Sequence, residues 1–237
     1  MMNGSCISYV TPADEALQTL RDAAQAGAVT LASSFSVEDM VLTDLIDRHG
    51  LAIGIFTLDT GRLPEETYAL MQAARRRYRT PVAVYAPQAA ALEPYIAAHG
   101  PNGFYDSIDL RQSCCAIRKV EPLKRALAGK QGWVTGLRRQ HSPTRRDLPL
   151  REWDEGNAMH KFNPLAAWSN EEVWAYVKAN DVPYNALHDR GFASIGCAPC
   201  TRAITVGEDI RAGRWWWENP DTKECGLHPA QADRKAS

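Results

Sequence analysis

Apolar residues follow two alternating patterns along the first half of the chain, one typical of helices and one typical of buried strands. Thr11 as N-cap, Pro12 at the first helical position and two acidic residues after it predict a helix that ends before Gly27. Similar periodicity predicts helices over 38–49, 64–78 and 170–179, and short apolar runs predict strands over 29–33, 52–58, 82–85 and 133–135. This alternation predicts an α/β fold, a parallel twisted sheet with helices on both faces.

The pattern changes from about residue 100, where Pro, Gly, Arg and Trp become frequent, and residues 185–228 have no regular periodicity. A long irregular stretch in a compact chain is usually functional. We therefore expect one domain over 1–237, with a core over about 28–180 and a C-terminal segment over about 185–237. That segment is expected to fold over the carboxyl ends of the strands, where parallel sheets bind ligands.

Composition narrows the possible functions. The 237 residues include 27 basic and 28 acidic side chains, a net charge of −1, which argues against non-specific nucleic-acid binding. Apolar runs stay well short of 18 residues, so we expect no membrane span, and the first residues do not resemble a secretory signal. A cytoplasmic protein is expected, and assembly into a homo-oligomer is left open.

The six cysteines are distributed unevenly, at Cys6, Cys114, Cys115, Cys197, Cys200 and Cys225. In a reducing compartment they are expected to be ligands or catalysts, since disulfides are rare there. Two close pairs of cysteines can form a zinc site or hold an iron–sulfur cluster. The third interpretation is that they are buried apolar thiols without a ligand role. Adjacent cysteines are poorly placed to share one ion but can reach different irons, so the spacing favours a [4Fe–4S] cluster.

Cationic residues lie beside several of these cysteines. Arg118 and Lys119 follow the adjacent pair, where they would offset the charge of a cluster or bind an anion, unless they form a solvated helix face. Lys223 and His228 flank Cys225, and cations of this kind lower the pKa of a thiol. One interpretation of this segment is therefore that Cys225 is reactive, and the other is that it is an incidental thiol near the C-terminus.

Four further segments are candidates for binding an anionic small molecule. Ser33–Ser36 lies between a predicted strand and a helix start, which suits a phosphate, although N-capping by Ser36 also explains it. Asp59 and Gly61 suit ribose hydroxyls and a close ligand, or an ordinary turn. Arg211 and Arg214 would share a helix face, and Arg138 begins a basic loop after the strand at 133–135.

Eight motifs follow one another from Ser33 to His228. They are SSFSVEDMVL, LDTGRLPEETY, CCAIRKVEPL, TGLRRQHSPTRRDLP, KFNPLAAWS, VPYNALHDRGFASIGCAPCTRAI, GEDIRAGRWWWE and KECGLH. In these motifs the chain resembles the assimilatory sulfonucleotide reductases, in particular bacterial adenosine 5′-phosphosulfate (APS) reductases. The resemblance implies an adenine nucleotide α hydrolase-like fold and a role in sulfate assimilation and cysteine biosynthesis. It implies one [4Fe–4S] cluster per subunit on Cys114, Cys115, Cys197 and Cys200.

The same resemblance assigns roles to other residues. It implies that Cys225 is the nucleophile, with Lys119, His228, Arg211 and Arg214 near the phosphosulfate. It places the nucleotide against two loops, formed by Ser33, Ser34, Phe35 and Ser36 and by Asp59, Thr60, Gly61 and Arg62. The expected chemistry is attack of Cys225 on the sulfur of APS, release of AMP and an S-sulfocysteine, from which an external dithiol such as thioredoxin releases sulfite. The cluster need not change oxidation state in this scheme.

Two departures from related proteins bear on the substrate. ATP pyrophosphatases carry a glycine-rich S-G-G-x-D-S loop, whereas this chain has bulkier residues over 34–39, which disfavours ATP chemistry. Reductases of 3′-phospho-APS (PAPS) usually lack the two cysteine pairs, so their presence favours APS. PAPS reduction at the same site is the alternative, followed by a zinc-stabilised nucleotide-binding or RNA-thiolation protein.

Overall fold

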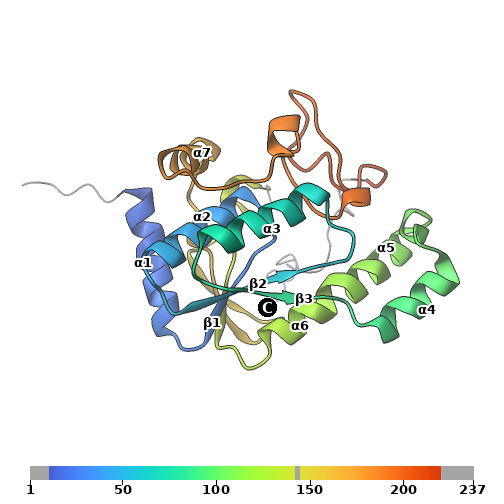
Figure 1. Ribbon diagram of the computed structural model, residues 1–237, viewed down its shortest axis with the longest axis horizontal. Helices are drawn as coiled ribbons and strands as arrows, with labels where there is room; N and C mark the ends of the chain where they lie inside the picture. The colour runs from blue at the N-terminus through green and yellow to red at the C-terminus, as the bar shows by residue number, and fades with distance from the viewer. Residues whose placement is uncertain (1–10, 142–144, 220–237) are drawn as a thin grey trace, which may run out of the picture.

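The computed structural model describes residues 11–141 and 145–219, and its centre is a six-stranded sheet in the order β3-β2-β1-β4-β6-β5 (Figure 1). The strands are β1 (Val29–Ala32), β2 (Ile53–Leu58), β3 (Val82–Tyr85), β4 (Gly132–Val134), β5 (Arg151–Asp154) and β6 (Met159–Phe162). The first four occur where the sequence predicts them. Their parallel pairing confirms the predicted α/β class.

The edge strand β5 is the one strand of the sheet that runs antiparallel to its neighbour, so the sheet is mixed. It forms a hairpin with β6 that the sequence analysis does not predict. The Asp154 carboxylate closes the turn by accepting bonds from the backbone N–H groups of Gly156 and Asn157. Because β5 is short and alternates between exposed and half-buried positions, its apolar content is too low to identify it as a strand.

Helices cover both faces of the sheet, as predicted. One face is covered by α1 (Pro12–Gln25), α2 (Val37–Arg48), α3 (Glu65–Arg77) and α7 (Asn170–Ala179), which bury the larger hydrophobic core. The helix α6 (Glu121–Leu127) packs on the opposite face in a second cluster with Phe56 and Trp133. The expected cap of α1 is present, because Thr11 and Asp14 form a reciprocal capping box.

Two further helices that the sequence analysis does not predict extend beyond the sheet, α4 (Ala89–His99) and α5 (Ile108–Cys115) (Figure 1). The chain runs from α5 into α6 through a π-helical turn, η2 (Ala116–Val120). Such wide turns insert an extra residue into a helix and occur often at functional sites. Here the turn carries Arg118 and Lys119, directly after the adjacent cysteines.

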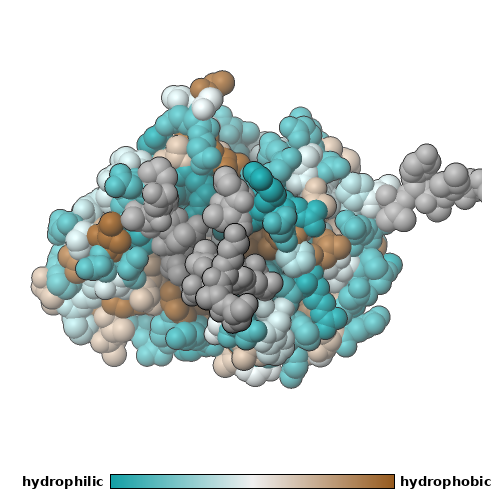
Figure 2. All heavy atoms as spheres, turned by 180° about the vertical axis from the view of Figure 1, so that it is seen from behind, coloured by the Kyte–Doolittle hydropathy of each residue, from teal (hydrophilic) through white to brown (hydrophobic). Residues whose placement is uncertain are grey.

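Among the coloured residues on the face shown in Figure 2, polar side chains predominate and hydrophobic side chains form small separate groups. No helix in the described ranges combines the length and apolar character needed to cross a bilayer. The segment after α7 has no long helix or strand up to residue 219 and lies above the sheet in Figure 1.

Candidate active site

A cavity of about 630 Å³, the main cavity, opens at the carboxyl ends of β1, β2 and β4. Ser33, Ser34 and Ser36 line it after β1, Thr60 after β2, and the 135–138 turn after β4. The irregular segment closes the opposite side with residues 191–196 and 204–211. The cavity therefore lies where a parallel sheet binds ligands, and the C-terminal segment covers it as expected.

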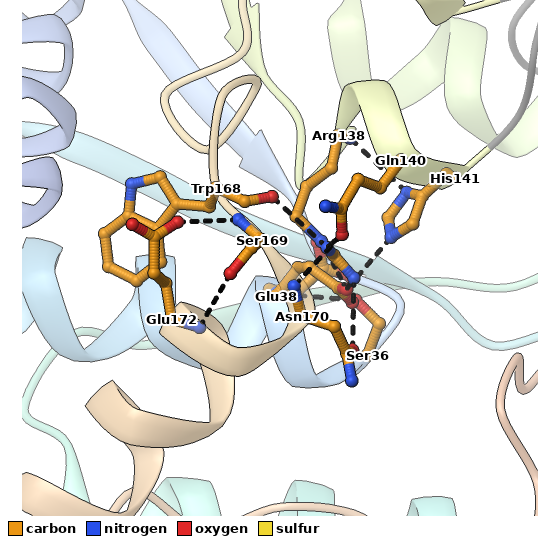
Figure 3. A network of polar contacts seen from close by, with 10 residues as sticks. Ser36, Glu38, Arg138, Gln140, His141, Trp168, Ser169, Asn170 and Glu172 are labelled. Carbon is orange, nitrogen blue, oxygen red and sulfur yellow. Dashed lines mark hydrogen bonds and ion pairs between the residues drawn. The ribbon is translucent and has the colours of Figure 1, made fainter.

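Buried charges form a network at the α2 end of the main cavity (Figure 3). Glu38 Oε1 lies 2.8 Å from Arg138 Nη2 and 2.9 Å from His141 Nε2. The backbone N–H of Arg138 donates to His141 Nδ1, so in this arrangement Nε2 carries the proton that is donated to Glu38. Arg138 also donates to the Trp168 carbonyl, which links the network to the start of α7. The expected anion-binding residue Arg138 thus lines the cavity with its charge already neutralised.

The two neighbouring carboxyl groups of α2 have opposite pKa shifts. Burial raises the pKa of Glu38, but His141 and Arg138 outweigh burial and lower it to about 2. Burial raises the pKa of Asp39 to about 6, even though the backbone and the hydroxyl of Ser34 both donate to this carboxyl group. A Cβ atom on Gly136 would collide with Asp39 Oδ1, so only glycine lets the β4 turn approach α2 this closely.

The four cysteines with predicted ligand roles come together around a second, small cavity, the cysteine cavity. Cys114 and Cys115 end α5, Cys197 precedes the 3₁₀ turn η6 (Ala198–Cys200), and Cys200 is its last residue. The N–H of Ala198 donates to the Arg62 carbonyl, which fixes η6 against the turn after β2. Within the described residues no three His, Cys, Asp or Glu side chains are gathered so as to hold a metal ion together. All four thiols line the same small cavity.

Positive charges and hydrogen-bond donors surround the cysteine cavity. Burial raises the pKa of Cys197, but the Lys119 ammonium, the Thr60 hydroxyl at 3.3 Å and nearby arginines together bring it below its usual value. Burial and the charge of Cys197 raise the pKa of Cys200 to about 12. Arg118 donates to the Thr60 carbonyl at 2.6 Å, and its buried Nε has no hydrogen-bond partner among the described residues.

Lys119 and Trp215 line both cavities and form the wall between them. Arg211 and Arg214 also line the main cavity, although they lie on a turn where the sequence analysis considered a helix. The guanidinium of Arg214 lies 4.8 Å from the centroid of the Trp215 indole. Its Nε is buried and unpartnered within the part of the chain that the structure describes. This end of the main cavity thus presents cationic donors.

Four residues expected in the nucleotide loops do not line the main cavity. Phe35 is buried in the core with a φ of 59°, so only its backbone belongs to the loop. Asp59 accepts hydrogen bonds from the Gly61 N–H and the Tyr68 hydroxyl, which close its own turn. Arg62 points to the Pro101 carbonyl and Asn102 and lines the cysteine cavity. Their placement follows from local turn closure and packing, whereas Ser33, Ser34, Ser36 and Thr60 line the cavity as expected.

Cys225 and His228 lie outside the described residues, so their expected roles stay predictions. Conversely, sequence reasoning did not identify Glu38, Asp39, His141, His188 or Trp215 as site residues. His188 packs edge-on against Trp174, and burial lowers its pKa, while its Nε2 has no partner in the described ranges. A carboxylate in the first turn of a helix, such as Glu38, is normally explained by the helix dipole, so no local signal distinguishes it.

Comparisons with known proteins agree with this geometry. Residues 28–203 match the model of the phosphoadenosine phosphosulfate reductase domain family. A protein of Allochromatium vinosum named adenosine 5′-phosphosulfate reductase is 60% identical over 200 residues, which cover 84% of this chain and 78% of that protein. A Burkholderia cepacia protein of the same name is 55% identical over 216 residues, covering 88% and 86%.

Solved structures support the same fold. The crystal structure of phosphoadenylyl-sulfate (PAPS) reductase from Candida auris, a phosphate complex, matches with a TM-score of 0.69 at 27% identity, covering 84% of this chain and 93% of that one. Yeast FAD synthetase matches with a TM-score of 0.52 at 14% identity, covering 81% and 67%, and shows similarity of fold alone.

Proposed function

The chain belongs to the phosphoadenosine phosphosulfate reductase domain family, and we propose that it reduces APS to sulfite and AMP through an S-sulfocysteine on Cys225. Its relatives are oxidoreductases by name, and the chain is an enzyme of this class. The observation that carries the proposal is that the main cavity and the cysteine cavity share one wall, formed by Lys119 and Trp215. On one side of this wall lie the four cysteines, and on the other side lie Arg211 and Arg214.

The main cavity supplies an orientation for the substrate. The Ser33–Ser36 turn and the 135–138 turn lie at the α2 end, where they suit the nucleoside, and Arg211, Arg214 and Lys119 lie at the other end, where they suit the phosphosulfate. Arg214 forms no ion pair with any described carboxylate, so its charge is available to an anion. Cations placed at this end stabilise the negative charge that develops on the departing phosphate oxygen.

The reaction transfers two electrons in two steps. The Cys225 thiolate attacks the sulfur of APS, an S–S bond forms, the S–O bond to the phosphate breaks, and AMP leaves with the bonding electrons. A thiolate of an external dithiol then attacks the Cys225 sulfur, and sulfite leaves with the electron pair of the S–S bond. The second thiol of the dithiol closes its own disulfide and frees Cys225. A general thiol reductant is required, and thioredoxin is the proposed one.

The cysteine cavity fits a [4Fe–4S] cluster, one per subunit, held by Cys114, Cys115, Cys197 and Cys200. The four thiols line one space, and two of them are adjacent in the chain, which suits ligands of separate irons better than ligands of a single zinc ion. The buried donors Arg118 Nε and Trp215 Nε1 are partnerless within the described part of the chain, and both residues line this cavity. When bound, the cluster would contribute to the electrostatics of the site and tie the irregular segment to α5.

The cavity also bears on the choice between APS and PAPS. Glu38 and Asp39 line its α2 end, and Arg138 and His141 are already engaged by Glu38. A further phosphate on the nucleoside would add negative charge beside these two carboxyl groups. This supports APS over PAPS.

The test is to mix anaerobically purified protein with sulfur-labelled APS in the absence of thioredoxin and to locate the label by peptide mass. One SO₃ on the Cys225 peptide, released as sulfite by thioredoxin, is the expected result. The Cys225→Ser variant is expected to form no adduct, and Cys6→Ser serves as the matched control that retains it. Iron and zinc analysis of the same samples tests the cluster.

The alternative outcomes are equally specific. An adduct formed with PAPS but not with APS would assign the chain to PAPS reduction. An absence of adduct with either substrate, in protein whose iron content is complete, would contradict the proposed chemistry. Zinc in place of iron would contradict the proposed [4Fe–4S] cluster. The role of Cys225 as the nucleophile would then depend on the adduct alone.

A further inference from the structure

Glu218 forms a buried ion pair with Arg111 that the proposed mechanism does not use. Arg111 Nε lies 2.8 Å from Glu218 Oε1, and Arg111 Nη2 lies 2.8 Å from Oε2. The two side chains are 1% and 4% exposed. Two parallel hydrogen bonds fix orientation as well as distance, so this pair clamps the chain four residues after Arg214 onto α5.

The chain between Arg214 and Glu218 is strained. Trp215 has a φ of 41°, which is unfavourable for a bulky side chain, and it is 2% exposed. A residue in such a conformation persists only where its surroundings determine it. The Trp215 N–H donates to the Cys200 carbonyl, and the Glu218 N–H donates to the Trp215 carbonyl. Together with the ion pair to Arg111, these contacts hold the turn in place.

The strained turn determines where Arg214 points. The guanidinium carbons of Arg111 and Arg214 lie 5.0 Å and 4.8 Å from the Trp215 ring centroid. The guanidinium of Arg214 also packs against Gly196, where a Cβ atom would collide with it. Its Nη1 donates only long hydrogen bonds, of 3.4 Å to the Ser194 hydroxyl and 3.5 Å to the Ile195 carbonyl. The side chain is therefore confined by packing against Trp215 and Gly196, and only weakly by hydrogen bonds.

We propose that Arg111 and Glu218 are positioning residues, which hold the Trp215 turn so that Arg214 faces the main cavity and binds the anionic end of the nucleotide. Arg111 carries a charge that Glu218 neutralises, whereas Arg214 keeps its charge for a ligand. The inference rests on the proposed function, because it assigns a support to the anion-binding arginine of that same site. It predicts that breaking the ion pair weakens binding of the anionic group and leaves binding of the nucleoside unchanged.

The experiment compares two inert ligands, ADP, which has a phosphoryl group where APS has a sulfuryl group, and adenosine, which lacks both anionic groups. Their dissociation constants are measured by calorimetry on anaerobically purified full-length protein with its iron content recorded. In Glu218→Gln, ADP affinity is expected to fall about tenfold or more, which corresponds to about 1.4 kcal/mol. Adenosine affinity and iron per chain are expected to stay within about twofold.

Two further variants keep the test decisive. Glu218→Gln leaves a buried guanidinium without its partner, which destabilises a fold, so Arg111→Met/Glu218→Met removes both charges together. The double variant is expected to fold, and because it also removes the contact of Arg111 with Cys115, its loss of ADP affinity supports the positioning role only where iron per chain is retained. Glu66→Gln is the matched control, since Glu66 joins Arg190 of the irregular segment to α3 through an exposed ion pair, and it is expected to bind both ligands normally.

The outcomes separate this inference from the proposed function. ADP binding at the wild-type level in both ion-pair variants would overturn the positioning role and leave the proposed function standing. An equal loss of ADP and adenosine affinity, or a loss of iron that parallels the loss of ADP binding, would show a general structural role and would also overturn it. Wild-type protein that binds ADP no more tightly than adenosine would contradict the anion site itself, and with it both proposals.

Discussion

The two ends of the main cavity are built differently. At the α2 end, Glu38, Arg138 and His141 satisfy one another in a network that also includes Gln140 and Asn170 (Figure 3). At the other end Arg214 and Trp215 bury side-chain nitrogens that have no partner within the described ranges, and Arg118 does so beside the cysteines. His188 is the exception, since its buried Nε2 has no partner in the described ranges although it lines the main cavity on the side of Glu38 and Trp174.

This difference indicates which end is complete without a ligand. A buried polar group without a hydrogen bond is unfavourable, so native proteins satisfy nearly all of them. The α2 end satisfies its charges internally, as expected of a rigid frame for the nucleoside in the proposed orientation. The arginine end lacks partners that a bound anion or cluster would supply. Substitutions at the first end should therefore affect mainly stability, and substitutions at the second end mainly binding.

The largest expected effect is on stability, at the α2 end. In Glu38→Gln the buried Arg138 loses its counter-charge, and removal of one member of a buried pair costs about 3–5 kcal/mol. We expect the free energy of unfolding in urea, measured anaerobically, to fall by that amount. Glu66→Gln, which breaks an exposed pair, should cost about 1 kcal/mol or less. An equal small cost in both variants would show that the α2 network does not depend on Glu38.

The next effect is a pH dependence from the neighbouring carboxyl group. The folded-state pKa of Asp39 is raised from 3.8 to about 6, so between these values the folded protein binds more protons than the unfolded chain. Its contribution is therefore lost as the pH rises from about 4 to 6. A two-unit shift corresponds to at most about 3 kcal/mol.

Asp39→Asn removes this titration. Relative to the variant, the wild type should be more stable at pH 4.5 than at pH 7.5, as measured from urea unfolding at both values. The pKa of the Glu38 carboxyl is lowered to about 2, so near pH 4.5 it contributes with the opposite sign, but Glu38 is present in both proteins and cancels in this comparison. A difference between wild type and variant that is independent of pH would contradict the raised pKa of Asp39.

At the arginine end the same kind of substitution should change binding. Arg214→Met removes a half-buried guanidinium without breaking any ion pair within the described residues. We expect ADP affinity to fall by about 2 kcal/mol, typical of a hydrogen bond to a charged group, or roughly 30-fold. The free energy of unfolding should stay within about 1 kcal/mol of wild type. A loss of stability as large as that of Glu38→Gln would remove the distinction between the two ends.

The smallest effect concerns the start of α2. Ser36 caps this helix by accepting a bond from the Asp39 N–H, and loss of such a cap costs about 1 kcal/mol. Ser36→Ala should lower the free energy of unfolding by that amount, whereas Ser36→Thr should retain most of the cap. Identical stabilities for Ala and Thr would mean that packing of the buried α2 alone holds the helix end.

Local signals in the sequence identify much of this fold. The Thr11 and Ser36 caps mark the starts of α1 and α2, and apolar runs mark β1, β2, β3 and β4. The hairpin of β5 and β6 lacks such a run. Helix α4 contains Pro94, which argues against a helix when only the sequence is known. Propensity and periodicity therefore identify elements that bury an apolar face, and they miss elements that depend on tertiary packing.

The site was partly predictable for a related reason. Cysteine spacing alone brought the two pairs together as candidates, and both pairs line one cavity. Arg62 was expected in a nucleotide-binding loop and Arg138 in an anion-binding loop, because the sequence around a cation in a loop does not indicate which residue it pairs with. Their partners, Asn102 for Arg62 and Glu38 for Arg138, lie 40 and 100 residues away in the chain, beyond the reach of any local pattern.

The separation of the two cysteine pairs along the chain has a consequence for biosynthesis. Cys197 comes 82 residues after Cys115, and chains are synthesised at roughly 5–20 residues per second, so about 4–16 s pass between the two. During that interval the nascent protein presents two adjacent thiols without their counterparts. Any group that requires all four sulfurs can be inserted only after the ribosome has passed Cys200, so maturation of this site must wait for synthesis of the second cysteine pair.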